Sequence, residues 1–311
     1  LVRSRGLGDV YKRQYLGISG VTSSEGLVSF DLAAGNYKIR VDYLGYQFWS
    51  DVYIVPDTLS EVFTISHQDI TITVSSLYQG VYDPLEGLNV YLFTLSGSYL
   101  GLYQVTDANG QVVFNLPDQE YKVRADYLGQ QFWSDVFLSQ DTPVDIPMAG
   151  AEVLATWNNF PLETVNIYAF SSTGSYLGLY GTTDISGTVT FRLPSSSTYK
   201  FRADYQGSQF WSAEEVLIAD QTNPIAISTG GGSFEFTVIK SVTEPLEGVN
   251  CYVFTEAGSY LGIYGVTSSE GLVSFDLAAG SYKIRVDYLG YQFWSDVYIV
   301  PDTLSEVFTI S

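Results

Sequence analysis

Short runs of alternating hydrophobic and polar residues, separated by turn residues, fill most of the chain, and no segment sustains a helical period. The pattern is most complete in residues 67–148. There it predicts strands near 69–77, 87–93, 98–105, 110–116, 120–127, 130–138 and 143–148. Seven short strands in about 80 residues predict an all-β fold of the sandwich type.

The same pattern recurs along the 311 residues. Trp49, Trp133, Trp211 and Trp294 follow one another at intervals of 84, 78 and 83 residues, whereas Trp157 lies outside the series. The sequence therefore predicts a tandem array of sandwich modules, each of about 80 residues. We number the repeats by the boundaries that turn-rich joints suggest: repeat 1, residues 15–66; repeat 2, 67–148; repeat 3, 149–229; repeat 4, 230–311. The "TGGGS" joint at 229–233 is typical of a flexible linker.

Repeat 1 matches residues 260–311 at all but two positions, where Ser19 stands for Tyr264 and Asn36 for Ser281. It lacks the opening strand and the "PLEG"-type strand of the later repeats, so we expect a truncated first module. The leader before it, residues 1–14, holds four of the chain's 14 basic residues and no apolar signal-peptide core. The leader resembles sequencing-adaptor read-through at the end of a metagenomic reading frame, and we expect it to be non-native.

One hairpin motif, "DYLGYQFWSD" at 42–51, returns in every repeat. In "YKIRVDY" the residues Tyr37, Ile39, Val41 and Tyr43 alternate with polar residues, so one face should be core and the other wet. A two-residue loop at Leu44 and Gly45 would pair an arginine with a tryptophan on the wet face. The predicted pairs are Arg40 with Trp49, Arg124 with Trp133, Arg202 with Trp211 and Arg285 with Trp294.

The same arithmetic pairs Lys38 with Asp51, Lys122 with Asp135, Lys283 with Asp296 and Lys200 with Ala213. Each cross-strand charge pair would contribute roughly 0.2 to 1 kcal/mol. Leucine is a poor residue for the positive φ of a type I′ turn, which leaves the turn type open.

Two interpretations of this wet face remain open. In the first, the arginine covers the indole by a cation–π contact, and the pair braces the hairpin. In the second, tryptophan and its neighbours form a platform for sugar rings, with Tyr46 and the glutamines at Gln47, Gln131, Gln209 and Gln292 as further contacts. Exposure of the indole distinguishes them, because a covered ring is structural and a bare ring is a candidate site.

A second recurring motif, "TDANG" at 106–110, reads as a tight turn closed by glycine and capped by the aspartate. A calcium loop is the alternative. It is disfavoured because "TSSEG" in repeats 1 and 4 replaces the aspartate with serine, and calcium needs several oxygen ligands. We therefore expect no metal.

The order "TDxxGxVxFxLP", followed by Tyr-Lys-x-Arg and preceded by "PLEGxNVY", resembles the carboxypeptidase regulatory-like and prealbumin-like (immunoglobulin-like) β-sandwich repeats of bacterial extracellular proteins. The resemblance covers nearly all of residues 15–311 and implies an extracellular or cell-surface location. Related collagen-adhesin repeats can carry a Lys–Asn isopeptide bond. Lys240 is the one lysine in an opening strand here, and repeats 2 and 3 have no equivalent, so we do not expect that bond.

Composition narrows the function further. The net charge of −20 argues against nucleic acid and against an anionic membrane surface, and no apolar run approaches the length of a membrane span. The sole histidine, His67, falls in a linker, and the sole cysteine, Cys251, falls at a core position, so no catalytic dyad or triad can be built and no cofactor is expected.

The sequence therefore predicts non-catalytic structural or interaction repeats, as in an adhesin-like stalk or a surface-display region of a larger secreted protein. Its partners would be another surface protein or a polysaccharide. A repeated carbohydrate-binding module is the first alternative, and an accessory region of an extracellular enzyme is the second. The oligomeric state is left open.

Overall fold

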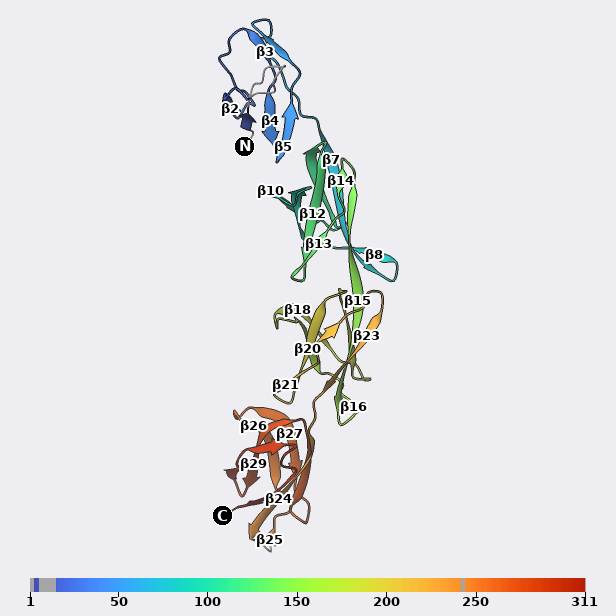
Figure 1. The fold of residues 1–311 in the computed structure, drawn as a ribbon. Coiled ribbons are helices and arrows are strands. Elements are labelled where there is room, and N and C mark those ends of the chain that lie inside the picture. The colour runs from blue at the N-terminus through green and yellow to red at the C-terminus, as the bar shows by residue number, and fades with distance from the viewer. Residues whose placement is uncertain (1–2, 6–14, 242–243, 311) are drawn as a thin grey trace. The chain divides into compact units, whose positions relative to one another are not determined.

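The computed structural model describes residues 3–5, 15–241 and 244–310, and within these ranges it is built from strands and turns (Figure 1). The all-β prediction is therefore confirmed. Among the described residues, no helix is long and apolar enough to cross a membrane.

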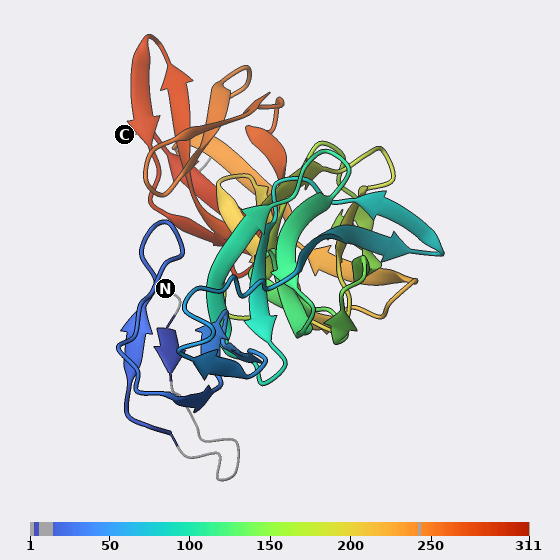
Figure 2. The same ribbon diagram turned by 90° about the horizontal axis from the view of Figure 1, so that it is seen from above.

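Repeat 2 is a sandwich of two layers. One layer has the strand order β10-β9-β12-β13, with β14 also beside β12, and the other places β7 between β11 and β15. The bounds are β7 His67–Tyr78, β8 Val81–Pro84, β9 Asn89–Thr94, β10 Tyr99–Val105, β11 Gln111–Pro117, β12 Glu120–Tyr127, β13 Gln130–Trp133, β14 Phe137–Leu138 and β15 Thr142–Trp157. The hairpin of β7 and β8 extends beyond the other strands of its layer (Figures 1 and 2).

Repeats 3 and 4 reproduce this plan. In repeat 3 the first layer runs β18-β17-β20-β21, and in repeat 4 it runs β27-β26-β29-β30. Repeat 3 contains β16 Phe160–Pro161, β17 Asn166–Ser171, β18 Tyr176–Thr182, β19 Thr188–Pro194, β20 Thr198–Tyr205, β21 Ser208–Trp211, β22 Glu215–Val216 and β23 Thr222–Ser228. Repeat 4 contains β24 Gly232–Ser241, β25 Glu244–Pro245, β26 Asn250–Thr255, β27 Tyr260–Val266, β28 Leu272–Leu277, β29 Gly280–Tyr288, β30 Tyr291–Trp294, β31 Tyr298–Val300 and β32 Ser305–Thr309.

The first and last strands of these repeats lie side by side and parallel. In repeat 3, β15 pairs with β23 from Gly150 to Thr156, and in repeat 4, β24 pairs with β32. The second layer is completed by an antiparallel partner in each case, β19 on β15 and β28 on β24.

Each core lies between the two layers and consists of the inward residues of both. In repeat 2 the fully buried side chains include Ile72 and Val74 from one layer and Val90, Leu92 and Val123 from the other. Cys251 is fully buried at the position of Val90, as predicted. The alternation of buried and exposed residues along β12 and β29 follows the period of two that the sequence shows.

Repeat 1 contributes a partial sandwich. Its strands are β2 Ser19–Val21, β3 Gly35–Tyr37, β4 Arg40–Tyr43, β5 Tyr46–Trp49 and β6 Tyr53–Val55. Of the leader, residues 3–5 form β1 Arg3–Arg5, which pairs with β2 on one side and β4 on the other. β1 thus occupies the place that β9 takes between β10 and β12; the remaining leader residues lie outside the described part of the chain.

Repeats 1 and 4 show how far context decides local structure, because their sequences are nearly the same. Residues 272–277 form β28 against β24, whereas residues 27–32 form no strand. Residues 305–309 form β32 against β24, and residues 60–64 again form no strand. The described part of repeat 1 offers no counterpart of β24, so these segments have no ladder to join and Leu27 and Val62 remain exposed.

Three strand predictions need correction. The predicted strand 130–138 is divided into β13 and β14, because the chain leaves the ladder after Trp133. β8 was missed. The strand predicted at 143–148 is longer in the structure, where β15 runs from Thr142 to Trp157.

The hairpin register follows the predicted arithmetic in all four repeats. Arg40 pairs with Trp49, and Arg124, Arg202 and Arg285 pair with Trp133, Trp211 and Trp294. Both loop residues have positive φ, 46° at Leu44 and 76° at Gly45, as a type I′ turn requires. The turn type left open by the sequence is therefore settled despite the leucine.

Candidate functional site

Four outward side chains form a row across the first layer of each complete repeat. In repeat 2 the register places Tyr103 beside Tyr91, Tyr91 beside Arg124, and Arg124 beside Trp133. The same Tyr–Tyr–Arg–Trp row recurs as Tyr180, Tyr168, Arg202 and Trp211, and as Tyr264, Tyr252, Arg285 and Trp294. We call this row the aromatic face. The sequence predicted the arginine and the tryptophan of this row. It did not predict the two tyrosines, because the prediction considered only the return strand of the hairpin.

The arginine lies closer to the inner tyrosine than to the predicted tryptophan. The Arg124 guanidinium carbon is 4.7 Å from the Tyr91 ring centroid, 5.5 Å from Phe93 and 5.9 Å from Trp133. In repeat 4, Arg285 is 4.5 Å from Tyr252 and 5.3 Å from Phe254. The brace is therefore a cluster in which one cation lies over several rings, with the tryptophan at its outer edge.

Each of these arginines also holds an aspartate two residues further along its own strand. Arg124 Nε donates to Asp126 Oδ1 at 2.8 Å and its Nη2 donates to Oδ2 at 3.0 Å, a bidentate pair. Arg285 and Asp287 repeat the geometry at 2.9 and 3.1 Å. The arginine's charge is thus balanced within its own strand, and its side chain is only about 20% exposed.

The indole is neither bare nor covered. Trp133 packs against Phe93, with ring centroids 4.7 Å apart, and keeps 46% of its surface exposed. Trp211 and Trp294 show the same packing and the same exposure. One side of the ring is therefore structural, and the other faces solvent. Tyr99, which also packs against Phe93, and Tyr103, at the opposite end of the row, are exposed as well.

The predicted lysine–aspartate pairs do not form, and a buried serine explains why. After Trp133 the hydroxyl of Ser134 accepts a hydrogen bond from the Val123 amide at 3.0 Å and donates to the Asp135 carbonyl at 2.7 Å. This bond takes the chain out of the ladder before Asp135 reaches Lys122. In repeat 3, Lys200, predicted opposite Ala213, instead pairs with Glu214 at 2.8 Å.

This serine clamp recurs in every repeat and accounts for the last letter of "QFWS". Ser50, Ser212 and Ser295 accept from the amides of Ile39, Phe201 and Ile284 at 2.9, 3.0 and 2.9 Å. All are buried. A serine among aromatic residues gives little sequence signal, so its role is visible only once the strand exit is known.

The predicted glutamines and Tyr46 separate in the structure. Gln47, Gln131, Gln209 and Gln292 are exposed on the tryptophan's side of the hairpin. Tyr46 points the other way, because successive residues of a strand face opposite sides. Its ring packs edge-on against Tyr121 at 5.3 Å, and its hydroxyl donates to the Glu120 carbonyl. Tyr46 is therefore a joint residue and not part of a sugar platform.

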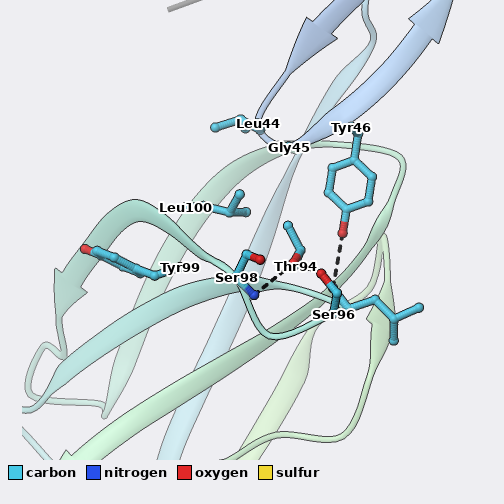
Figure 3. Close-up of a pocket in the computed structure, with 9 residues that line it drawn as sticks. Leu44, Gly45, Tyr46, Thr94, Ser96, Ser98, Tyr99 and Leu100 are labelled. Atoms are coloured by element: carbon cyan, nitrogen blue, oxygen red, sulfur yellow. Dashed lines mark hydrogen bonds between the residues drawn. The ribbon is translucent and has the colours of Figure 1, made fainter.

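Figure 3 shows that joint between repeats 1 and 2, an open depression of about 680 Å³. The tip of the first hairpin, Leu44 to Tyr46, lies over the turn that joins β9 to β10. The fit is close, since a Cβ on Gly45 would lie 3.0 Å from Thr94 Cγ2 and 3.3 Å from Leu100 Cδ2. The Leu95 amide donates to the Tyr46 hydroxyl at 3.4 Å.

Repeats 3 and 4 meet in the same way. The hairpin tip Gln206 to Ser208 lies on the turn between β26 and β27, and a Cβ on Gly207 would lie 2.5 Å from Thr255 Cγ2 and 3.3 Å from Leu261 Cδ2. These are the counterparts of Gly45, Thr94 and Leu100. The Gln206 amide binds the backbone of repeat 4 twice, donating to Asp276 at 3.1 Å and accepting from Ala278 at 2.7 Å.

Two further contacts close this second joint. Trp157, which falls outside the tryptophan series, donates its indole N–H to the Leu277 carbonyl at 3.0 Å. Thr229 is buried and accepts from the Ala279 amide at 3.0 Å. A Cβ on Gly231 would lie 2.0 Å from the Leu277 carbonyl oxygen, so glycine there permits close approach. The "TGGGS" segment is a fitted contact, contrary to the flexible linker expected.

The "TDANG" turn is held by its own side chains. Asp107 Oδ1 accepts from the amides of Asn109 and Gln111 at 2.9 and 2.8 Å, and in repeat 4 the Ser268 hydroxyl takes its place. The preceding Thr106 is buried, accepting from the Leu88 amide and donating to the Leu85 carbonyl. Within the described residues, no group of three or more His, Cys, Asp or Glu side chains could hold a metal ion.

The remaining reactive side chains are engaged. Burial raises the pKa of the Cys251 thiol to about 12, with a smaller contribution from the charge of Asp287. His67 contacts the Ile65 carbonyl at 2.7 Å and the Tyr43 hydroxyl at 3.3 Å. Lys240, the isopeptide candidate, forms an ion pair with Glu244 at 3.1 Å.

No family model matches the chain, and no curated protein matches its sequence. Solved structures give weak likenesses. The Bacillus anthracis TIE protein is 13% identical, with coverage of 99% of this chain and 68% of its own and a TM-score of 0.26. The minor pilin GBS52 of Streptococcus agalactiae is 16% identical, with coverage of 51% of this chain and 94% of its own and a TM-score of 0.31. BcpA, the major pilin subunit of Bacillus cereus, is 13% identical, with coverage of 79% of this chain and 99% of its own and a TM-score of 0.24. At such TM-scores these likenesses carry no conclusion about this chain.

Proposed function

We propose that the chain is a non-catalytic array of sandwich repeats in which a hairpin-tip joint couples repeat 1 to repeat 2 and repeat 3 to repeat 4. The observation that carries this is the recurrence of one contact set, Gly45 on Thr94 and Leu100, and Gly207 on Thr255 and Leu261. We place the repeats in the carboxypeptidase regulatory-like or prealbumin-like class. Their role would be that of an adhesin-like stalk or surface-display region in a secreted or cell-surface bacterial protein.

Coupling matters for such a role because the stability of a repeat array is the sum of each repeat's own stability and an interface term between neighbours. Exposed loops would leave that interface term close to zero. Here the Gln206 amide and Thr229 supply three hydrogen bonds to repeat 4 backbone groups. Each contributes about 1 kcal/mol or less.

The proposal of a non-catalytic role is supported by the surroundings of the cysteine and the histidine, which leave neither side chain available to a substrate. The thiol of Cys251 is fully buried, and its raised pKa keeps it protonated and unreactive at neutral pH. Each of the imidazole nitrogens of His67 has an oxygen partner within 3.3 Å. Neither residue therefore offers a nucleophile or base to a substrate.

Gln206→Ala tests the proposed coupling. We expect faster hydrogen exchange at the Ala278 amide, which loses its acceptor, and separate unfolding of repeats 3 and 4. Gln209→Ala is the matched control, because Gln209 lies on the same hairpin and is exposed on its outward side. If both variants exchange and unfold like the wild type, the joint does not couple the repeats and the proposal is wrong.

The aromatic face favours a second function, binding of a neutral polysaccharide. About half of each indole is exposed, the tyrosine at the other end of each row is exposed too, the arginine charge is balanced by aspartate, and three copies would raise avidity for a polymer. Tryptophan fluorescence titrated with neutral polysaccharides tests this. Tyr103→Ala should weaken binding without loss of stability, since Tyr103 is exposed. If Trp133→Ala lowers only the melting temperature and leaves binding unchanged, the face is structural.

A further inference from the structure

Each aromatic face carries a lysine two residues before its arginine. In repeat 2 this is Lys122, which the register places beside Phe93 on β9. Trp133 lies on β13, on the far side of β12 from Phe93, yet the two ring centroids are only 4.7 Å apart. Neighbouring strands are about 4.8 Å apart, so the indole must reach across β12 to touch Phe93. It therefore passes between Arg124 and Lys122, and a cation flanks it on either side.

The two flanking cations differ in their partners. Arg124 forms a bidentate pair with Asp126. Among the lysines that the structure describes, Lys200 of repeat 3 and Lys240 form ion pairs, whereas Lys122 and its counterpart in repeat 4, Lys283, form none. Both of these unpaired side chains are partly exposed. The faces of repeats 2 and 4 therefore each present an unbalanced positive charge beside an indole that is 46% exposed.

A one-residue bulge explains why these lysines lack an acid. The ladder pairs Arg124 with Trp133, but its next part pairs Glu120 with Leu138, one residue further along than a straight ladder allows. The return strand has thus gained one residue at the serine clamp, which is a β-bulge. In repeat 4 the register shifts in the same way. The shift places valine, and not aspartate, opposite each lysine: Val136 opposite Lys122, and Val297 opposite Lys283.

Repeat 3 has the same register and a different outcome. Tyr199 pairs with Glu215, which places Glu214 opposite Lys200. The lysine and this glutamate form an ion pair at 2.8 Å. Repeat 3 thus has the same tryptophan and arginine as its neighbours, but its lysine is neutralised from across the ladder.

We infer that the lysines of repeats 2 and 4 bind carboxylates carried by the polysaccharide that lies on the aromatic face. The inference deepens the proposed polysaccharide binding and rests on it. The ligand is then a polymer of neutral sugars with occasional uronic acid units, in which neutral rings contact the indole and an acidic unit reaches the lysine. Charge complementarity identifies this occupant, because an ammonium group without an acid partner favours a carboxylate. Repeat 3 would hold neutral units alone.

The chain's net charge of −20 is compatible with such a ligand when the charges of the polymer are sparse. Exposed charges are largely screened beyond about 8 Å at physiological salt, so each lysine responds chiefly to its neighbours. Glu120 lies two residues from Lys122 on the same face of its strand, and Ser281 takes that place beside Lys283. Lys283 should therefore contribute more to carboxylate binding than Lys122.

The test compares a glucuronoxylan with the same polymer after chemical reduction of its carboxyl groups to alcohols. Calorimetric titration of the full chain at about 0.15 M salt measures both affinities. We expect the wild type to bind the intact polymer about twofold to fivefold more tightly, the size of an exposed ion pair. Lys122→Gln combined with Lys283→Gln should abolish this preference, and about 1 M salt should do the same.

Glu214→Gln should increase the preference, because it leaves the charge of Lys200 unbalanced. This gain does not depend on the double lysine variant, so the test holds even if that variant does not fold. Lys240→Gln is the matched control, since Lys240 is paired with Glu244 on the other layer and its loss should leave the preference unchanged.

Equal binding of the two polymers, or a preference that survives in the double variant, would overturn the inference. Binding of the reduced polymer with no preference for the intact one would leave the proposed polysaccharide binding in place. If neither polymer binds, the aromatic face does not hold such a polymer, and the inference is wrong together with the function on which it rests.

Discussion

The indole N–H of Trp157 donates a hydrogen bond to the carbonyl oxygen of Leu277 at 3.0 Å, across 120 positions of sequence. Trp157 ends the opening strand of repeat 3, and Leu277 ends β28 of repeat 4. The one tryptophan outside the repeating series therefore serves the joint between modules and not the aromatic face.

Trp157→Phe keeps an aromatic ring and removes the donor. We expect the free energy of unfolding of repeats 3 and 4 to fall by about 1 kcal/mol, the net contribution of such a bond. Urea denaturation measures it. Trp294→Phe is the control, because the Trp294 indole packs against Phe254 on the outward face. An equal fall in the free energy of unfolding for the control would contradict the assignment.

Gly207→Ala and Gly290→Ala form a matched pair. Both glycines have positive φ, 76° and 81°, so alanine costs each turn about 1 to 2 kcal/mol. Only at Gly207 does the new methyl group also meet a neighbour, Thr255. We expect the Gly207 variant alone to increase exchange at Ala278, as read by mass spectrometry. Equal effects of the two substitutions would mean that the tip does not dock.

Ser134→Ala should destabilise repeat 2 by about 1 to 3 kcal/mol, because the buried Val123 amide loses its acceptor. Thermal denaturation followed by Trp133 fluorescence is the measurement. Asp135→Ala is the control, since Asp135 contributes only a backbone carbonyl to the clamp. If the two variants have the same melting temperature, the serine hydroxyl does not stabilise the point where the chain leaves the ladder.

Repeat 4 should lose stability at alkaline pH through Cys251. Its thiol has a pKa near 12 when folded, raised by burial from the ordinary 9.0. Above pH 9 the unfolded chain releases this proton and the folded chain keeps it, so stability falls as pH rises from 9 towards 12. Tyr282, whose pKa burial raises to about 12, acts in the same direction above pH 10.

Cys251→Val, the residue that repeat 2 has at this position, should make the alkaline fall less steep. Urea midpoints between pH 8 and 11 would show it, with Cys251→Ser as a second comparison. An unchanged slope in the valine variant would show that the thiol is not the titrating group.

The hairpin could be predicted from sequence because two constraints agree. The period of two assigns each residue to a face, and a two-residue loop then fixes every partner, so Arg124 opposite Trp133 followed without any long-range information. The nearer contact of Arg124 with Tyr91 did not follow, since strand β9 is more than 30 positions away and its place beside β12 depends on the order of strands in the sheet.

The joints were beyond sequence reasoning for a different reason. Gln206, Trp157 and Thr229 belong to no periodic pattern, and each acts through hydrogen bonds to backbone groups of the next repeat. Three consecutive glycines indicated flexibility, whereas Gly231 is required for close approach to Leu277. Likewise, residues 27–32 carry a strand pattern and form no strand, because a strand also needs a partner.

The parallel pairing of first and last strands has a mechanical consequence. In repeat 4 the chain enters at the Gly232 end of β24 and leaves beside Ile239 at the opposite end, by way of β32. Tension applied to the two ends of this module would slide the two strands past each other. All the hydrogen bonds of that ladder would then bear the load together, whereas a hairpin pulled at its open end gives way one bond at a time.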